Sequence, residues 1–210
     1  MNRLPLHQDL YLIAHDQAGK PLIHQSSMEL GLAGAVLLEL ALGGHVAVAG
    51  GRAAASVRGS TGDTIADDLV ALITRGHSDV RSLIKKAAGG LYDRTREALL
   101  ASGVLVRVSG RRMGMLPYTR YRLADIASVV RASSGVRSAV EGWKPPDARC
   151  AALCGLVAVL RLEAELYLDQ PAGRLVGRLR EIAAESSPVA AELVAVVDTL
   201  VGEAAVAVYR

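Results

Sequence analysis

The chain has 210 residues, 24 basic and 21 acidic side chains, and a formal net charge of +3 at neutral pH. This length is sufficient for one sizeable hydrophobic core, and we expect a single compact domain over residues 1–210. Because phenylalanine is absent and aromatic residues make up only 3% of the chain, ring stacking cannot dominate that core. Packing of Ala, Val and Leu side chains between helices is expected instead.

Two membrane-related classes are excluded by the apolar pattern. The amino terminus lacks the continuous apolar run of a secretory signal. Of three longer apolar stretches, two contain carboxylates and one is too short to cross a bilayer. These stretches are Leu30–Ala49, Val189–Val208 and Cys150–Leu160. We therefore predict a cytoplasmic protein without a transmembrane helix.

The first segments are predicted to form a short helix or strand, a turn and a long helix. His7–Ala14 favours a short helix or strand, and Asp16–Gly19 favours a turn because Asp and Gly supply its hydrogen bonds and its positive φ. A helix that starts from a cap at Ser26 or Ser27 runs to about Leu42. Since it is apolar on nearly every side, we place it at the centre of the core.

A hairpin and two further helices follow. The Gly50–Gly51 pair between short alternating runs, His45–Ala49 and Arg52–Val57, predicts a tight turn between two strands. The next helix is capped by Asp63 and ends at Thr74. Another helix starts at Ser78 or Asp79 and ends at Ala101, with a break near Gly89–Gly90 and a left-handed cap at Gly103.

The second half is predicted to be one hairpin followed by helices. Val104–Val108 and Met113–Tyr121 read as strands joined by a turn at Ser109–Gly110. Helices are then expected at about Leu123–Val140, Asp147–Leu168, Pro171–Ala184 and Pro188–Val208, with Asp147 as a cap. The predicted fold class is thus mainly α, a multi-helical domain with one or two β-hairpins, one of them basic and projecting.

The sequence offers no convincing catalytic or metal-binding pattern. The five histidines form no metal-ligand pair at helical spacing, and no glycine-rich phosphate loop is present. Cys150 and Cys154 lie four residues apart in an apolar helical stretch, where reduced core thiols are expected. We predict no catalytic residues, no metal, no cofactor and no enzymatic activity.

Positive charge is concentrated in one segment. Residues 81–122 contain ten basic side chains and only two acidic ones, a net charge of +8 that the rest of the chain largely cancels. Such a segment is typical of a surface that meets anionic ligands. The candidate headgroup-binding residues are Lys85, Lys86, Arg94, Arg96, Arg111, Arg112 and Arg120.

The tip of the second hairpin combines apolar side chains with this charge. Basic residues around exposed apolar ones suit an interfacial membrane contact. Alternatively, the apolar side chains pack inward and the arginines protect the edge of the sheet from pairing. The candidate membrane-inserting residues are Met113, Met115, Leu116 and Tyr118.

Three sequence blocks carry a resemblance to a known family. They are LPLHQDLYLIA at Leu4–Ala14 with the turn after it, GLAGAVLLELAL at Gly31–Leu42, and RTREALLASGVL at Arg94–Leu105. In this order they resemble the Golgi phosphoprotein 3 family, over nearly the whole chain. Because only four of the basic residues are lysines, as in GC-rich bacterial genomes, the chain looks like a bacterial member.

The resemblance implies a mostly helical domain that binds phosphatidylinositol 4-phosphate, inserts a hairpin into the bilayer and, in eukaryotes, recruits Golgi glycosyltransferases by their cytoplasmic tails. In an ungapped pairing, the headgroup tryptophan of the family falls on His24, and its three headgroup arginines fall on Ala33, Gly89 and Tyr92. We therefore predict general binding to anionic phospholipids at the inner membrane face rather than a conserved phosphoinositide pocket.

Two functional hypotheses other than lipid binding remain open. A helix that ends at Gly103, followed by a basic hairpin, also fits a winged-helix protein that binds nucleic acid, although few α-helical side chains there could reach base edges. The hairpin could also hold a protein partner or a second copy of the chain. Duplex binding with a steep salt dependence and no liposome binding would favour the nucleic-acid reading.

Overall fold

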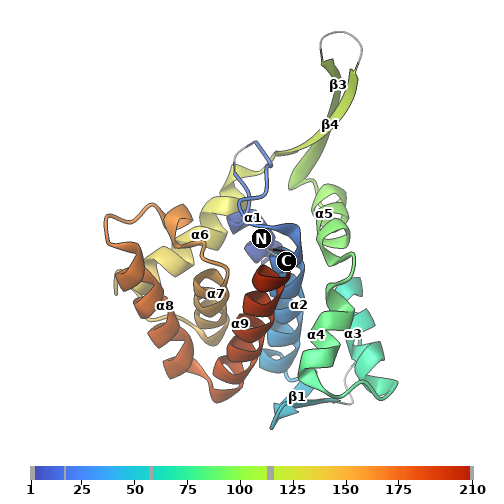
Figure 1. The fold of residues 1–210 in the computed structure, drawn as a ribbon, viewed down its shortest axis with the longest axis vertical. Coiled ribbons are helices and arrows are strands. Elements are labelled where there is room, and N and C mark those ends of the chain that lie inside the picture. The colour runs from blue at the N-terminus through green and yellow to red at the C-terminus, as the bar shows by residue number, and fades with distance from the viewer. Residues whose placement is uncertain (1–2, 17, 57–58, 113–115, 209–210) are drawn as a thin grey trace.

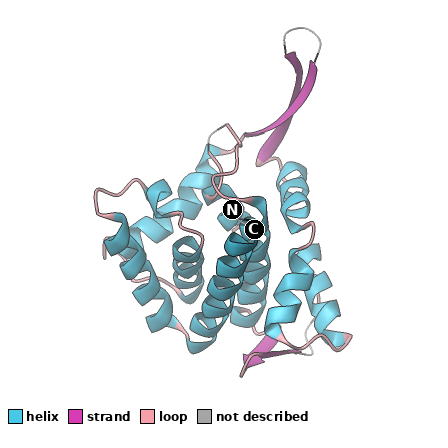
Figure 2. Cartoon of the chain, in the orientation of Figure 1, coloured by secondary structure: helices cyan, strands magenta, loops and turns pink. Residues whose placement is uncertain are grey.

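The computed structural model describes residues 3–16, 18–56, 59–112 and 116–208, with the backbone alone for residues 111, 112, 116–118 and 208. A helical body carries one long β-hairpin that projects from it (Figures 1 and 2). The predicted fold class is confirmed. The helices are α1 (Leu6–Ile13), α2 (Gln25–Leu42), α3 (Thr64–Thr74), α4 (Val80–Ala88), α5 (Leu91–Ala101), α6 (Ile126–Val140), α7 (Ala148–Val159), the 3-10 helix η1 (Glu163–Leu166), α8 (Ala172–Ser186) and α9 (Pro188–Val208). The strands are β1 (Val46–Ala49), β2 (Arg52–Ala55), β3 (Leu105–Arg112) and β4 (Leu116–Leu123).

Helix α2 forms the centre of the body, as its apolar surface predicts. It packs against α1, α4, α7 and α9, and Met28, Leu32 and Leu37 along it are fully buried. Figure 1 shows α2 and α9 in the middle, with α6, α7 and α8 on one side of this pair and α3, α4 and α5 on the other. A helix that is apolar all round is stable only in such a position.

Two glycines of α2 permit the close approach of its neighbours. A Cβ atom placed on Gly34 would collide with Val197 Cγ2 of α9, and one placed on Gly31 would lie 2.7 Å from Leu160 Cδ1. The two positions differ in how easily the neighbour can move. Val197 is β-branched and stiff, whereas the end of the Leu160 side chain can change rotamer.

We expect Gly34→Ala to destabilise the protein by about 1–3 kcal/mol through overpacking, and Gly31→Ala to cost clearly less. Urea denaturation of the two variants beside the wild type measures both values. Since both substitutions place the same methyl group on the same helix, helix propensity cancels in the comparison. Equal stabilities for the two variants would contradict this account of the α2–α9 contact.

Aspartates begin three helices where the sequence predicts caps. The side chains of Asp63, Asp79 and Asp147 accept hydrogen bonds from backbone N–H groups in the first turns of α3, α4 and α7, at 2.7–2.9 Å. Helix α2 differs from the prediction. Its cap is His24, whose Nδ1 accepts from the backbone N–H of Ser26, so the helix begins earlier than a serine cap would place it.

Helix α7 is shorter than predicted. It ends at Val159 instead of continuing to Leu168, and the chain reverses at Arg161, which has a φ of +57°. The reversal lets Leu162 and Leu166 reach the core, where both are buried. Helix α6 likewise begins at Ile126, because Leu123 still pairs with Leu105 in the sheet.

The two hairpins differ in how well the sequence located their turns. Gly50 and Gly51 adopt φ values of +57° and +73° between β1 and β2, which confirms the tight turn. In the second hairpin the predicted turn at Ser109–Gly110 is wrong, because these residues pair with Thr119 and Tyr118. Strand-forming Thr and Tyr partners favour a longer ladder. The residues between β3 and β4, 113–115, lie outside the described part of the chain.

Candidate functional site

The projecting hairpin is the most strongly charged element of the protein. Residues 105–123 contain five arginines and no acidic residue. The strands pair from Leu105↔Leu123 at the base to Arg112↔Leu116 at the far end. At the base, the buried Val104 accepts hydrogen bonds at its carbonyl from the backbone of Ala124 and Asp125. The hairpin is therefore fixed to the body at one end only, as Figure 1 shows.

A cluster of rings and guanidinium groups supports the base of the hairpin. The Arg96 guanidinium lies 4.2 Å from the centre of the Tyr121 ring of β4 and 5.6 Å from that of Tyr92 of α5. Tyr92 in turn shares a 2.9 Å hydrogen bond with His15, which stacks on Tyr11 of α1. Cation–π contacts of this kind contribute about 0.5–2 kcal/mol each. Arg96 is thus packed between α5 and β4 and pairs with the carboxylate of Asp93 at 2.8 Å.

The turn after α1 packs against the same strand. Asp16 Oδ1 accepts from the backbone N–H groups of Ala18 and Lys20, which confirms the predicted turn. Gly19 has a φ of +77°, and a Cβ atom there would collide with the carbonyl oxygen of Tyr121. Glycine is required at this position because the backbones of the turn and the strand touch.

Apart from Arg96, the basic residues of α4 and α5 contact partners outside the hairpin. Lys85 and Arg81 pair with Glu203 of α9, and Arg94 pairs with Asp68 of α3. Lys86 Nζ lies 2.7 Å from Nε2 of His77. Arg96 thus lies against the hairpin, whereas Lys85, Lys86 and Arg94 contact partners elsewhere, so the structure does not gather the four into one anion site. Glu203 and Asp68 offset part of the charge of α4 and α5. Residues 105–123 hold no acidic residue of their own, and of their arginines Arg107 pairs with Glu97 of α5.

The remaining predicted site residues belong to the hairpin itself. Arg120 is exposed on β4 opposite Val108. Arg111 and Arg112 end β3, and Leu116 and Tyr118 lie in β4, where the structure describes their backbone. Met113 and Met115 lie outside the described residues.

Exposed apolar side chains accompany the hairpin at its base, which the sequence analysis did not find. Ile126 and Val130, one turn apart at the start of α6, are 68% and 55% exposed. Val106 of β3 and Leu22 of the turn region are also exposed. The signal could have been found in the i, i+4 spacing of two aliphatic residues just after a basic strand, but their exposure depends on which face of α6 packs inward.

The four positions aligned with the family's headgroup residues do not form a pocket. Ala33 is fully buried in α2, and Tyr92 is buried in the cluster beneath the hairpin. His24 caps α2, and Gly89 follows α4. Two of the four positions thus belong to the core.

A buried charged network joins α1, α2 and α7. Arg149 donates to Asp9 Oδ2 and to Glu39 Oε1, each at 2.8 Å, and to the carbonyl of Leu4. The Leu6 N–H donates to the second oxygen of Glu39. Burial, the largest influence, raises the pKa of Asp9, although the Arg149 guanidinium opposes this. Three helices are therefore held together by one guanidinium group.

His7 adjoins this network in its neutral form. Burial lowers its pKa to about 4, so its 3.6 Å approach to Asp63 is a contact with a neutral ring at neutral pH. Its Nε2 is buried and has no hydrogen-bond partner within the described residues. His7 and Asp9 come from the first of the three sequence blocks, and Glu39 comes from the second.

The parts of the chain that the structure describes contain neither a metal-ligand cluster nor a membrane-spanning helix. No group of three His, Cys, Asp or Glu side chains there could hold a metal ion. None of the helices combines the length and apolarity needed to cross a bilayer. Cys150 and the buried Cys154 are free thiols, as predicted.

Comparison with known proteins agrees with the fold and with the sequence blocks. The family model described as Golgi phosphoprotein 3 (GPP34) matches residues 6–200. A search of curated proteins finds no match. The matched range contains the buried network, the glycine contacts of α2 and the projecting hairpin. Since the match covers most of the chain, the protein belongs to the Golgi phosphoprotein 3 family.

Proposed function

We propose that this protein is a cytoplasmic peripheral membrane protein that binds anionic phospholipid headgroups through the hairpin end of the molecule, without catalysing a reaction. One observation carries the proposal: an acid-free hairpin with five arginines projects from the body, and exposed aliphatic side chains lie at its base. Arginines near an anionic leaflet contribute about 1 kcal/mol each, and inserted methylene groups about 0.8 kcal/mol each.

The proposed binding is selective for charge rather than for one phosphoinositide. Family membership supports lipid binding as the general activity. The positions aligned with the family's headgroup residues are occupied by His24, Ala33, Gly89 and Tyr92, and two of these are buried. Phosphatidylinositol 4-phosphate is then bound as one anionic lipid among others.

Sedimentation with vesicles tests the proposal directly. The whole chain is mixed with phosphatidylcholine vesicles of stepped phosphatidylserine content, at low and at high salt. We expect binding that rises with anionic content and falls with salt, because exposed charges are screened. Matching the total charge with phosphatidylinositol 4-phosphate instead should give a similar curve. Equal sedimentation with neutral and anionic vesicles at low salt would refute the proposal.

A second test addresses the aliphatic residues at the hairpin base. We expect Ile126→Ser/Val130→Ser to weaken vesicle binding by at least about tenfold, because methylene groups no longer enter the interface. Since both side chains are exposed, the melting temperature should stay within experimental error of the wild type. Tyr167→Ser is the matched control, because Tyr167 is 78% exposed in the loop after η1. If the double variant bound vesicles with the wild-type affinity, α6 would not be part of the membrane contact.

The structure gives less support to a nucleic-acid function. The charged side chains of α5 are engaged in ion pairs: Asp93 with Arg96, Arg94 with Asp68 of α3, and Glu97 with Arg107 of β3. A helix that enters a major groove needs free donors on the side that faces the bases. Duplex binding with a steep salt dependence, together with no vesicle binding, would reverse this preference.

A further inference from the structure

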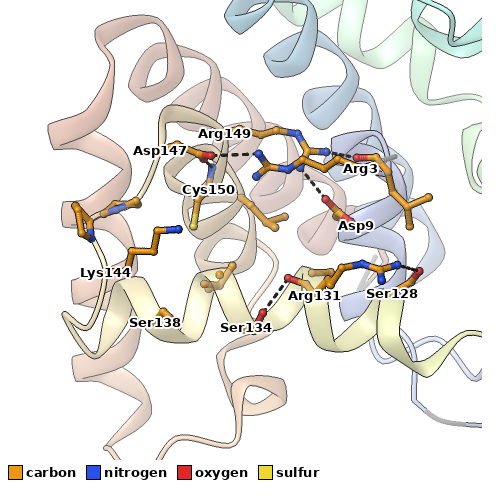
Figure 3. Close-up of a pocket in the computed structure, with 17 residues that line it drawn as sticks. Arg3, Asp9, Ser128, Arg131, Ser134, Ser138, Lys144, Asp147, Arg149 and Cys150 are labelled. Atoms are coloured by element: carbon orange, nitrogen blue, oxygen red, sulfur yellow. Dashed lines mark hydrogen bonds and ion pairs between the residues drawn. The ribbon is translucent and has the colours of Figure 1, made fainter. Parts of the chain in front are cut away.

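A cavity of about 580 Å³ lies between α6 and the first turn of α7, away from the residues of the hairpin (Figure 3). The amino-terminal segment at Arg3 and Leu4 and the loop at Lys144–Asp147 complete its wall. Small-molecule sites in proteins commonly enclose about 300–1,000 Å³. The cavity therefore has room for a metabolite-sized ligand.

The wall contributed by α6 is polar and partly open to solvent, since Arg131, Ser134 and Gly135 are exposed. It presents Ser128, Arg131, Ser134 and Ser138, with the small residues Ala132 and Gly135 between them. The Ser138 hydroxyl has no hydrogen-bond partner among the described residues, and Ser134 donates only to the backbone of its own helix. Both hydroxyls are available to a ligand.

The basic side chains in the wall differ in whether they already form ion pairs within the protein. Arg3 pairs with Asp147, Arg131 with Asp125, and Arg149 with Asp9 and Glu39. Lys144 is the exception, because within the described part of the chain its ammonium group has no ion pair or hydrogen bond. Figure 3 shows Lys144 pointing from its loop toward Cys150.

The same wall contains carboxylates, and these restrict the kinds of anionic ligand that could bind in the cavity. Asp9 and Asp147 would repel a bare anion but accept hydrogen bonds from hydroxyl groups. Lys144, the remaining donors of Arg131 and the serine hydroxyls suit a phosphate group. A ligand that satisfies both parts of the wall carries a phosphate group and several hydroxyl groups.

We infer that this cavity binds a small polyhydroxylated phosphate, such as a sugar phosphate, with Lys144 and Ser138 contacting the phosphate group. The inference does not depend on membrane binding by the hairpin. The same chemistry occurs in a soluble metabolite and in the headgroup of a phosphorylated inositol lipid, and the test separates these sources.

Cys150 provides a reporter inside the cavity, because it lines the wall while Cys154 behind it is fully buried. A hydrogen bond from the Cys154 thiol lowers the pKa of Cys150, which favours its alkylation. Iodoacetamide labelling of Cys150 in the whole chain, followed by mass spectrometry, is measured with glucose 6-phosphate, glycerol 3-phosphate, glucose and potassium chloride at matched ionic strength. We expect millimolar sugar phosphate to slow labelling at least about fivefold, and glucose or chloride to leave it unchanged.

Lys144→Gln is the decisive variant, since Lys144 is exposed on a loop and its removal should not affect folding. It should raise the concentration for half-protection at least about tenfold, as expected for loss of a charge-assisted hydrogen bond. The two proteins are compared by this half-protection concentration and not by the labelling rate itself. The substitution also changes the charge near Cys150, which can alter the rate without any ligand. Lys86→Gln, on α4, is the matched control and should retain the wild-type value.

Vesicles with phosphatidylinositol 4-phosphate form the second arm. Protection by these vesicles and not by soluble phosphates, lost in Lys144→Gln, would assign the cavity to a lipid headgroup, and the reverse would assign it to a soluble metabolite. Protection by neither, or protection that Lys144→Gln leaves unchanged, would overturn the inference. Failure of vesicle binding by the hairpin variants would leave this result unaffected, because the hairpin contributes no residue to the cavity.

Discussion

Arg149→Ala should lower the free energy of unfolding by about 3–5 kcal/mol, the largest stability effect that we expect of any single substitution in this protein. Arg149 lies between Asp9 and Glu39, and its side chain is only 14% exposed. Its removal leaves the buried Asp9 without its ion-pair partner and the Leu4 carbonyl without this donor. Urea denaturation at neutral pH measures the loss.

The pH dependence of this loss provides a further check. Without the guanidinium group, the folded-state pKa of Asp9 should lie still further above its unfolded value, so the folded state binds more protons than the unfolded state as pH falls. By linkage, the stability deficit of the variant should shrink from neutral pH to about pH 5. Removing Arg149 also removes one of the charges that lower the pKa of His7, and this acts in the same direction, because the folded variant then binds a proton at His7 more readily than the folded wild type.

Two controls identify the cause of the effect. Arg178→Ala removes an exposed guanidinium group paired with Glu181 on the same helix and should cost less than about 1 kcal/mol. Combining Arg149→Met with Asp9→Asn and Glu39→Gln should recover part of the stability, since no uncompensated charge is left. If Arg149→Ala cost no more than Arg178→Ala, the network would not be holding the three helices together.

Arg111→Glu/Arg112→Glu should weaken binding to anionic vesicles by about two to three orders of magnitude. Each arginine near the leaflet is worth about 1 kcal/mol, and each new glutamate is repelled by a similar amount. Arg111 and Arg112 end β3, at the part of the described hairpin farthest along the strands from its base. Vesicle sedimentation at low salt gives the affinity, and thermal unfolding verifies that the fold is retained.

The matched control carries the same change in net charge at a different place. Lys85→Glu/Lys86→Glu alters two exposed lysines of α4, whose neighbours are Glu203 and His77. We expect this variant to lose less than about tenfold in affinity, because its charges lie away from the hairpin. Equal losses in the two variants would mean that total charge sets the affinity and that the hairpin has no special role.

Much of the local structure follows from short sequence signals. Aspartate caps begin α3, α4 and α7 because the carboxylate bonds an N–H group only two or three residues away. The Gly50–Gly51 turn likewise depends on the conformations of two adjacent residues. Where no local signal marks the change, prediction failed: residues 160–168 contain no glycine or proline, although helix α7 ends at Val159.

The sequence by itself determined that the chain is mainly helical, which helix lies at its centre, and that positive charge gathers in residues 81–122, because periodicity, apolar content and charge are properties of neighbouring residues. Only the tertiary structure decided how that charge is distributed. Glu203 and Asp68 approach the cations of α4 and α5 from other helices and offset part of their charge, whereas the hairpin holds no acidic residue of its own. Arg149 meets Asp9 and Glu39 across 140 and 110 residues, and the polar cavity forms where α6 turns its serines toward α7. Such contacts depend on which faces pack together, and a one-dimensional pattern does not specify that choice.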